Sequence, residues 1–417
     1  MSIISSKNVN EIIRKTLSMI NKKIIDHGEI TGYIFYKMLE YENIYSEQEL
    51  VDYTMLGILH DIGLYKEANV KNLINYELKN PWPHSIYGFL FLKYFSPMED
   101  KAEVVLYHHL DYYLYSKIQS KYLHLAECLS LADQMDTFMR SKGEDMEKDY
   151  FTKYKNIRFS ARALELFFKA EEKYKITEKM ANGSYKAELS ALLSNKVFSE
   201  SYKKGFLEML VYTIDFRSEH TVIHTMSTVN FAQQLGRLMK LSTVDLNDLY
   251  YGALLHDIGK IAIPLEILES TGPLSQEEMR IMKAHVRITE MILEGVVDQK
   301  VVDIAARHHE KLDGTGYHKG LTEEELNLPQ QIVAVADILS ALYGKRSYKE
   351  AFDSTKIINI IKADAANHKI SQPIVDCLLA NYDDIIGNFE KEKDTTIGLY
   401  LKIKEQYEIE LRRFEQL

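Results

Sequence analysis

The residues best suited to chemistry gather in the later half of the chain, around the sequences LLHDIGK at 254–260 and HHEKLDGTGYH at 308–318. Imidazole and carboxylate side chains stand there among Val, Ile, Ala and Leu, where burying an uncompensated polar group is costly. A metal ion would compensate them. The candidate ligands of this half are His224, His256, Asp257, His285, His308, His309 and Asp337.

This ligand set suits a pair of metal ions better than a single ion. Five imidazoles and two carboxylates are too many for one tetrahedral zinc, and they match two metals that share a carboxylate. We expect the shared group to be Asp257, because adjacent side chains at a helix end point in different directions and His256 and Asp257 therefore suit different metals. Nitrogen and oxygen ligands without thiolate favour iron or manganese, with zinc and nickel also open.

Two closely spaced cations lower the pKa of a water between them and screen the charge of a phosphodiester. The expected chemistry is therefore in-line attack of a metal-bound hydroxide on phosphorus. For any single histidine the alternative is a hydrogen-bonded core imidazole. We adopt that interpretation for His124 and His368, which lie outside the pattern.

The same order of residues occurs once before in the chain. Ten of the fourteen histidines belong to this double pattern, and the offset between corresponding positions stays between 196 and 204. Such self-similarity indicates two related domains. The earlier set, a candidate second metal site, is His27, His60, Asp61, His84, His108, His109 and Asp133.

Helices are expected to position these side chains. Across 244–256, apolar residues recur at steps of three and four, which predicts an amphipathic helix that ends near His256. Gly259 is expected to stop that helix.

Ser275 and Glu278 have the spacing of a capping box that opens a helix of about eighteen residues, on which His285 faces inward. A further helix is predicted over 297–309, with His308 on its inner face. Asp337 stands in the middle of an apolar helical stretch, where an unpaired carboxylate is rare.

The whole chain is predicted to be all-α, in two tandem helical domains. No stretch predicts a multi-stranded sheet, and seven prolines and nineteen glycines in 417 residues favour helix. The clearest turn between the repeats is Ala181-Asn182-Gly183-Ser184, and we expect a domain boundary near 195. The stretch 390–417 is charged and partly helical, which fits either a packing helix or a dimer contact.

The amino-acid composition limits which binding partners and which cell compartment we expect for the protein. A net charge of −10 argues against a nucleic-acid polymer, since phosphate backbones need a basic surface. Two isolated cysteines, Cys128 and Cys377, suggest no disulfide framework and fit a reducing cytoplasm. The first twenty-five residues hold no apolar signal core, and no run of eighteen apolar residues occurs, so we expect a cytoplasmic protein without a membrane span.

HDIGK followed by HHEKLDGTGYH and the Asp-bearing IVAVAD resembles the HD-GYP family of the HD superfamily. Members of that family are helical, dimetal phosphodiesterases that hydrolyse cyclic dinucleotides, chiefly cyclic di-GMP. The resemblance covers roughly 200–375. It implies two tandem HD-type domains, an HD-like domain over 1–195 without the GYP loop and an HD-GYP-like domain over 196–417.

The resemblance also implies roles for individual residues. One metal would be held by His224, His256, Asp257 and Asp337, and the other by Asp257, His285, His308 and His309. Three cations, Lys260, Arg346 and Lys349, would hold the substrate phosphates. Gly314 and Gly316 permit the loop that carries Tyr317 over the site. The expected catalytic residues are Asp257 and Lys260.

The sequence departs from the family pattern at several positions. His318 replaces the proline of GYP, so the loop loses a fixed φ angle. Ser340 stands where many relatives carry a second aspartate. His220 stands where some relatives place a ligand for a third metal, although we expect two. The N-terminal copy keeps its ligands and Asp136, but it has Leu64 in place of the lysine and no DGxGY loop.

The expected function is hydrolysis of cyclic di-GMP to pGpG and onward to GMP. An alternative substrate is cyclic GMP-AMP or a guanosine polyphosphate, and the alternative class is a nucleotide receptor or scaffold without turnover. The N-terminal copy is expected to bind metal, either as a regulatory or structural domain or as a second hydrolase. A homodimer or a signalling protein as partner is left open.

Overall fold

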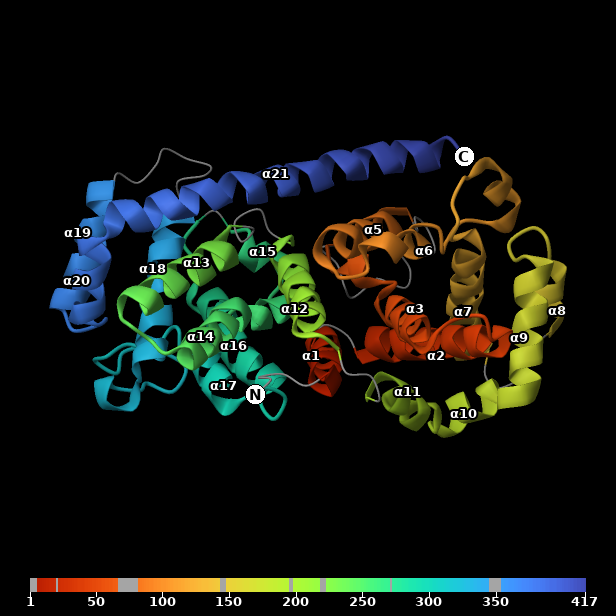
Figure 1. Cartoon of the computed structure of the whole chain (residues 1–417), viewed down its shortest axis with the longest axis horizontal. Helices are drawn as coiled ribbons and strands as arrows, with labels where there is room; N and C mark the ends of the chain where they lie inside the picture. The colour runs from red at the N-terminus through yellow and green to blue at the C-terminus, as the bar shows by residue number, and fades with distance from the viewer. Residues whose placement is uncertain are drawn as a thin grey trace. The chain divides into compact units, whose positions relative to one another are not determined.

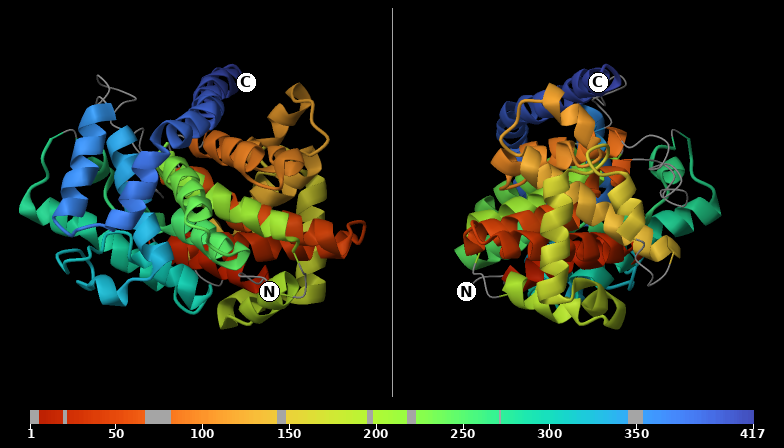
Figure 2. Two further views of the ribbon diagram at one scale, coloured as in Figure 1. Left: turned by 60° about the vertical axis from the view of Figure 1, so that its left-hand side comes forward. Right: turned by 90° about the vertical axis from the view of Figure 1, so that its right-hand side faces the viewer.

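The computed structural model describes residues 6–19, 22–66, 82–142, 148–194, 198–217, 223–270, 272–344 and 354–417. Helices and connecting loops make up this part of the chain, and no β-strand is drawn in it (Figures 1 and 2). The prediction of an all-α fold is confirmed. Within the same ranges, no helix is both long enough and apolar enough to cross a membrane.

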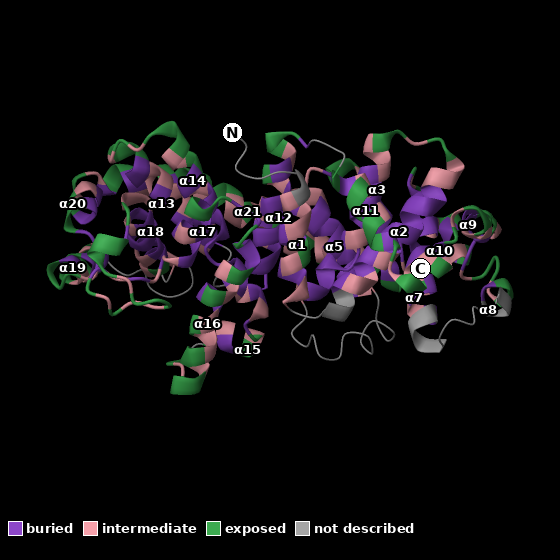
Figure 3. Ribbon diagram, turned by 90° about the horizontal axis from the view of Figure 1, so that it is seen from below, coloured by how far each residue is buried: buried purple, intermediate pink, exposed green. Residues whose placement is uncertain are grey.

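Two compact units divide the chain. The N-terminal unit comprises Ser5–Met209 together with Ile403–Leu417, and the C-terminal unit comprises Leu210–Lys402. Buried residues gather inside each unit and exposed residues on its outer faces (Figure 3). The helices α12 (Glu200–Asp215) and α21 (Tyr382–Glu415) contribute residues to both units.

The elements of the N-terminal unit that precede α12 are α1 (Ser6–Ser18), α2 (Lys22–Glu42), α3 (Glu47–Leu59), η1 (Ile62–Lys66), α5 (Trp82–Phe95), η3 (Glu99–Lys101), α6 (Glu103–Leu106), η4 (Tyr112–Lys117), α7 (Leu123–Lys142), α8 (Lys148–Lys153), α9 (Ala161–Tyr174), α10 (Ile176–Asn182) and α11 (Tyr185–Ser194). Gly183, in the predicted turn, ends α10 with a φ angle of 77°.

The elements of the C-terminal unit between α12 and α21 are α13 (His224–Leu238), α14 (Thr243–Leu255), η5 (Ile258–Ala262), α15 (Leu265–Leu268), α16 (Gln276–Leu293), α17 (Gln299–Ala306), η6 (Glu323–Glu325), α18 (Leu328–Gly344), α19 (Ser354–Ala366) and α20 (Gln372–Ala380). Apolar side chains of α13, α14, α18, α19 and α20 form the core of this unit.

The sequence repeat is also a structural repeat. The order α2, α3, η1, α5, α6, α7 in the first unit recurs as α13, α14, η5, α16, α17, α18 in the second. Each histidine or aspartate of the pattern lies on, or shortly after, the corresponding element of the two series. His60 and His256, for example, both follow the last residue of a helix as its C-cap.

Local capping explains where the site-bearing helices begin. The side chain of Ser242 accepts a hydrogen bond from the backbone of Asp245 at the start of α14. Ser275 and Glu278 form the predicted capping box at the start of α16, which has the predicted eighteen residues. The prediction over 297–309 was too long, because α17 ends at Ala306 and His308 lies in the turn that follows.

The expected role of Gly259 as a helix stop was wrong. The residue lies inside η5, where an added Cβ would stand 2.1 Å from the carbonyl oxygen of His285 on α16. Its counterpart Gly63 in η1 would meet the carbonyl oxygen of His84 at 2.0 Å. A glycine is needed here because η5 and η1 pack directly on the helix that carries the next histidine of the pattern.

Candidate active site

Asp257 stands at the centre of the C-terminal cluster. Its Oδ2 lies 3.2 Å from Nε2 of His224 and 3.1 Å from Nε2 of His256. Its Oδ1 lies 3.3 Å from Nε2 of His285 and 3.9 Å from Nε2 of His308. The two oxygens of one carboxylate therefore face two separate pairs of imidazoles.

Asp337 on α18 is the second carboxylate of the cluster. Its Oδ1 lies 3.0 Å from Nε2 of His224, and its Oδ2 lies 3.5 Å from Nδ1 of His309. The structure thus brings together every ligand predicted for this half of the chain.

Backbone hydrogen bonds orient the imidazoles. In His256, His285 and His308, Nδ1 lies 2.6 to 2.7 Å from the carbonyl oxygen three residues earlier. A carbonyl only accepts, so Nδ1 carries the proton and donates, which leaves the Nε2 lone pair directed at Asp257. This is the tautomer in which an imidazole binds a metal through Nε2.

Ser340 has a corresponding role for His224. Its Oγ lies 2.9 Å from Nδ1 of His224 and donates to the backbone carbonyl of the same residue. In the N-terminal unit, Asp136 holds the equivalent imidazole, with its Oδ2 2.6 Å from Nδ1 of His27. The serine that departs from the family pattern therefore occupies the position of a supporting acid.

The electrostatics keep most of these groups in the form that binds a cation. Burial lowers the pKa of His285 to about 3. Burial opposes ionisation of Asp257, but the neighbouring His256 and Lys260 hold the pKa of this carboxyl well below its ordinary value. His224 is the exception, because hydrogen bonds to Asp257 and Asp337 outweigh its burial and raise its pKa to about 9.

The cluster fits a pair of cations. Oδ1 of Asp257 is buried, and no described residue gives it a hydrogen bond. A buried carboxylate oxygen without a donor is expensive unless an ion satisfies it. Ligand atoms lie close enough for a metal in two groups, one of His224, His256 and Asp257 and one of His285, His308 and His309.

The structure describes only some of the residues that are expected to bind substrate. The ammonium of Lys260 lies 2.5 Å from Oδ2 of Asp257, so this lysine belongs to the cluster itself. Arg346, Lys349 and the third-metal candidate His220 lie outside the described residues.

The loop after His309 covers one side of the cluster. The ring of Tyr317 lies 4.8 Å from the ring of His309. Glu310, which is buried, accepts hydrogen bonds from the backbone of Lys319 and Leu321 and so holds the loop. His318, at the position of the family proline, lies 2.8 Å from a carboxylate oxygen of Glu290 on α16.

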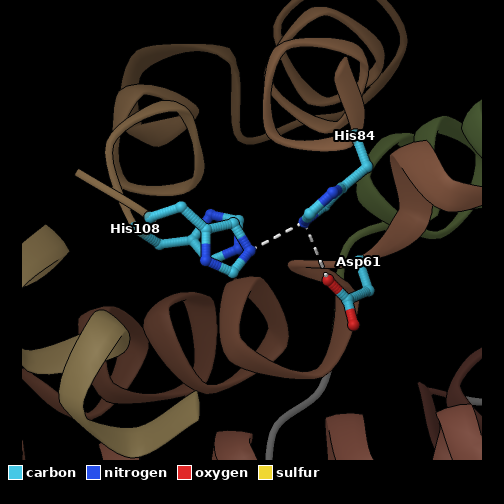
Figure 4. A group of neighbouring side chains, drawn as sticks. Asp61, His84 and His108 are labelled. Carbon is cyan, nitrogen blue, oxygen red and sulfur yellow. Dashed lines mark hydrogen bonds and ion pairs between the residues drawn. The ribbon is translucent and has the colours of Figure 1, made fainter. Parts of the chain in front are cut away.

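The N-terminal candidates also come together. Nε2 of His27 lies 3.0 Å from Asp133, and Nε2 of His60 lies 3.3 Å from Asp61. Figure 4 shows Asp61 and His84 turned toward each other, and Oδ1 of Asp61 lies 3.5 Å from Nε2 of His84. His108 faces them from the turn that follows α6. Ligand atoms again form two groups, one of His27, His60 and Asp133 and one of Asp61, His84, His108 and His109.

The two clusters differ in charge and access. Leu64 replaces Lys260, and burial raises the pKa of Asp61 to about 6, opposite to the shift at Asp257. The side chain of His309 is 27% exposed, whereas that of its counterpart His109 is 5% exposed. At this histidine the N-terminal cluster is therefore the more enclosed of the two.

Comparison with known proteins supports this arrangement. The HD domain family model matches residues 208–372. A Vibrio cholerae protein named 3'3'-cGAMP-specific phosphodiesterase 1 is 26% identical over 390 residues, which cover 88% of this chain and 90% of that protein. Residues 208–372 thus match the HD domain family, and the resemblance predicted from the sequence is confirmed.

Other relatives match a shorter part of the chain. A cyclic di-GMP phosphodiesterase response regulator of Xanthomonas campestris is 36% identical over 209 residues, 48% of this chain and 54% of that protein. The chain thus spans about half the length of this relative. The crystal structure of a cyclic GMP-AMP specific phosphodiesterase of V. cholerae shares the fold, with a TM-score of 0.56 and 18% identity over 92% of this chain and 98% of that one.

Several supporting residues escaped the sequence analysis. The hydroxyl of Thr289 on α16 accepts from the backbone of Gly259 and donates to the carbonyl of His256, so it ties η5 to the end of α14. The sequence analysis also did not predict that Glu310 accepts from the backbone of the loop or that Ser340 contacts His224. For Thr289 and Ser340 the sequence signal was a polar residue on the inner face of a helix. Such a signal does not show which group the side chain contacts.

Proposed function

We propose that the C-terminal unit is a metal-dependent phosphodiesterase that cleaves a cyclic dinucleotide. The observation that carries this proposal is the position of Asp257, whose two oxygens face different imidazole pairs. That arrangement suits a carboxylate shared by two cations. The names of HD-GYP relatives in Vibrio and Xanthomonas supply the substrate class.

One metal would be held by His224, His256, Asp257 and Asp337, and the other by Asp257, His285, His308 and His309. A cation pair supplies Lewis acidity and acidifies a water for attack on phosphorus. Nitrogen and oxygen donors without thiolate favour iron or manganese in both positions.

The remaining site residues act on the substrate. Lys260 is the cation nearest to Asp257 and would pair with a phosphate oxygen as the charge of the phosphodiester enters the site. We propose that Arg346 and Lys349 also bind the substrate phosphates, because of their place in the sequence. Tyr317 lies in the same loop as Gly314 and packs on His309. It would form one wall of the substrate site.

Among cyclic dinucleotides, 3'3'-cGAMP is our first candidate and cyclic di-GMP the second. The Vibrio cholerae relative named as specific for 3'3'-cGAMP matches this chain over nine-tenths of its own length, and the match includes the N-terminal half. The Xanthomonas relative named for cyclic di-GMP matches about half of the chain.

For the N-terminal unit we propose metal binding without hydrolysis of the same substrate. Leu64 offers no cation where Lys260 stands, and His109 is nearly closed off while His309 is not. We also propose a cytoplasmic location, because the two free cysteines, Cys128 and Cys377, fit a reducing compartment.

The test uses the full chain loaded with manganese under reducing conditions and given equal concentrations of 3'3'-cGAMP and cyclic di-GMP. We expect linear dinucleotide to accumulate, faster from 3'3'-cGAMP, and to disappear in Asp257→Ala. The matched variant Asp61→Ala should keep the activity. Tight binding of either nucleotide without product would contradict the proposal and support a receptor.

A further inference from the structure

Arg217, the second residue after α12, is a buried cation outside the ligand set of the C-terminal cluster. Burial lowers the pKa of its guanidinium, yet an arginine keeps its proton in proteins. Removing a guanidinium from water is costly unless hydrogen-bond acceptors replace the water. The acceptors of Arg217 therefore indicate what its side chain does.

Two of these acceptors are backbone carbonyls of η5. Nη1 of Arg217 donates to the carbonyl oxygen of Ile261 at 2.6 Å and lies 3.3 Å from that of Lys260. The last carbonyls of a helix have no partner inside the helix, and a cation is favourable at that end. Arg217 thus holds the end of η5 from a segment 43 residues earlier in the chain.

The backbone around Lys260 is held on both sides. The N–H of Gly259, directly before it, donates to the hydroxyl of Thr289, and the carbonyls of Lys260 and Ile261 accept from Arg217. Because the side chain of a lysine is long and flexible, the position of its backbone decides which groups its ammonium can reach. Here the ammonium lies 2.5 Å from Oδ2 of Asp257.

The internal repeat separates this contact from the folding of the short helix. Arg217 stands seven residues before His224, the first histidine of the C-terminal pattern, and Ile20 stands seven residues before His27, the first of the N-terminal pattern. The N-terminal copy therefore has an apolar residue in the sequence position of the arginine.

The same copy has Leu64 in the position of Lys260, so the two cations are replaced together. The short helix η1 nevertheless forms over Ile62–Lys66, as η5 does over Ile258–Ala262. An arginine at this position is thus not required for the short helix itself, and it accompanies the lysine.

We propose that Arg217 is a positioning residue that places Lys260 for contact with a substrate phosphate. It acts through Lys260 and does not itself touch the substrate. The consequence for catalysis rests on the proposed function, because Lys260 is the proposed phosphate-binding cation. The placement of Lys260 by Arg217 is a property of the chain alone and can be tested without substrate.

The first experiment measures the reactivity of the Lys260 amine in the full-length chain, by labelling with a low concentration of acetic anhydride and mass spectrometry. In Arg217→Met we expect Lys260 to be acetylated at least about threefold faster, since its ammonium is no longer held against the Asp257 carboxylate. The exposed Lys300 is the internal reference and should not change.

Arg217→Lys keeps the charge and a donor, and it should restore most of the protection of Lys260. Arg237→Met, which removes an exposed arginine on α13, is the matched control and should leave the labelling unaltered. Circular dichroism verifies that each variant has folded. If Arg217→Met has not, Arg217→Gln, which keeps a polar group in the buried position, takes its place. Unchanged labelling of Lys260 in the folded variant overturns the inference.

The second experiment is a double-mutant cycle with the manganese-loaded chain and 3'3'-cGAMP. Arg217→Met should raise KM about 5- to 10-fold and change kcat less than about twofold, because the lost contact acts on substrate binding. In the Lys260→Ala background the same substitution should change KM by less than about twofold, since its effect passes through the lysine.

The outcomes distinguish this inference from the proposed function. If the unaltered chain hydrolyses 3'3'-cGAMP and the two substitutions multiply in KM, the inference is wrong and the proposed function stands. If the unaltered chain neither hydrolyses nor binds the nucleotide, the proposed function is wrong, and the labelling of Lys260 alone decides whether Arg217 positions it.

Discussion

At the scale of single residues, Asp257 and Asp61 occupy equivalent places with different neighbours. Lys260 lies against Asp257, whereas Leu64 follows Asp61. The grouping of the candidate ligands could be predicted from sequence, because the HD pair and the HH pair recur at a nearly constant offset. Their supporting contacts could not, since a serine three residues after an aspartate says nothing about which imidazole it meets.

Lys260→Ala should raise KM roughly 10- to 100-fold, the range expected when a charge-assisted hydrogen bond to a phosphate is lost. Metal content should stay near that of the unaltered protein, because a lysine is not a ligand. Steady-state kinetics with elemental analysis measures both, and Lys300→Ala at an exposed position serves as the control. Loss of metal with KM unchanged would contradict the phosphate-binding role.

Ser340→Ala removes the hydroxyl beside Nδ1 of His224. We expect metal affinity to fall about 10- to 100-fold, as is typical when the partner of a ligating histidine is lost. Competition with a fluorescent chelator measures it. Ser227→Ala, which removes a hydroxyl bonded to Ser340 but not to the imidazole ring, should have a smaller effect. Equal losses in the two variants would rule out a specific role for Ser340.

At the scale of elements, the short helices η1 and η5 fix the distance between the HD pair and the third histidine. Gly259→Ala would drive a Cβ into the backbone of α16. The expected cost is about 1–3 kcal/mol, as for an overpacked core, together with weaker metal binding. Gly398→Ala on α21, where an added Cβ meets nothing within 4 Å, is the control and should not destabilise the chain. Urea unfolding compares the two, and similar stabilities would contradict the packing argument.

The contact between α2 and α11 is predicted to depend on pH. Glu188 accepts from Lys37, Lys179 and Tyr33. Burial opposes the shift, but these partners lower its pKa from 4.5 to about 2. Because the folded pKa is the lower one, the stabilisation is present above about pH 4.5 and is lost as the pH falls toward 2.

Glu188→Gln should therefore destabilise the chain by about 1 kcal/mol or less at pH 6.5 and by a smaller amount at pH 3.5. Urea unfolding at the two pH values gives the difference. Glu165→Gln, which alters an exposed pair with Lys169, should have less effect. A larger loss of unfolding free energy for Glu188→Gln at pH 3.5 than at pH 6.5 would contradict this prediction.

Helices with local signals were the most predictable elements. The capping box at Ser275 fixes the start of α16 within the sequence itself. The extent of α21 was not predictable, because its end is held by distant aromatic side chains, with Phe414 packed on Trp82 and Tyr407 stacked on Tyr87. Gly259 was misassigned for the same reason, since its neighbour α16 is distant in sequence.

At the scale of the whole molecule, a repeated helical unit carries two metal-type clusters of different character. The C-terminal cluster combines a lysine and a loop bearing Tyr317 with its ligands. In the N-terminal cluster Leu64 replaces the lysine, and His109 is less exposed than its counterpart His309. We therefore expect catalysis to depend on the C-terminal ligands alone, and metal content to depend on both sets.

The most direct test of the account is the metal content of the C-terminal cluster. The chain carrying Asp61→Ala and Asp133→Ala, reconstituted with manganese and desalted, should retain two equivalents by elemental analysis. Adding Asp257→Ala should remove both together, because one carboxylate is proposed to serve the two ions. Loss of a single equivalent, or retention of both, would contradict the assignment of Asp257 as the shared ligand.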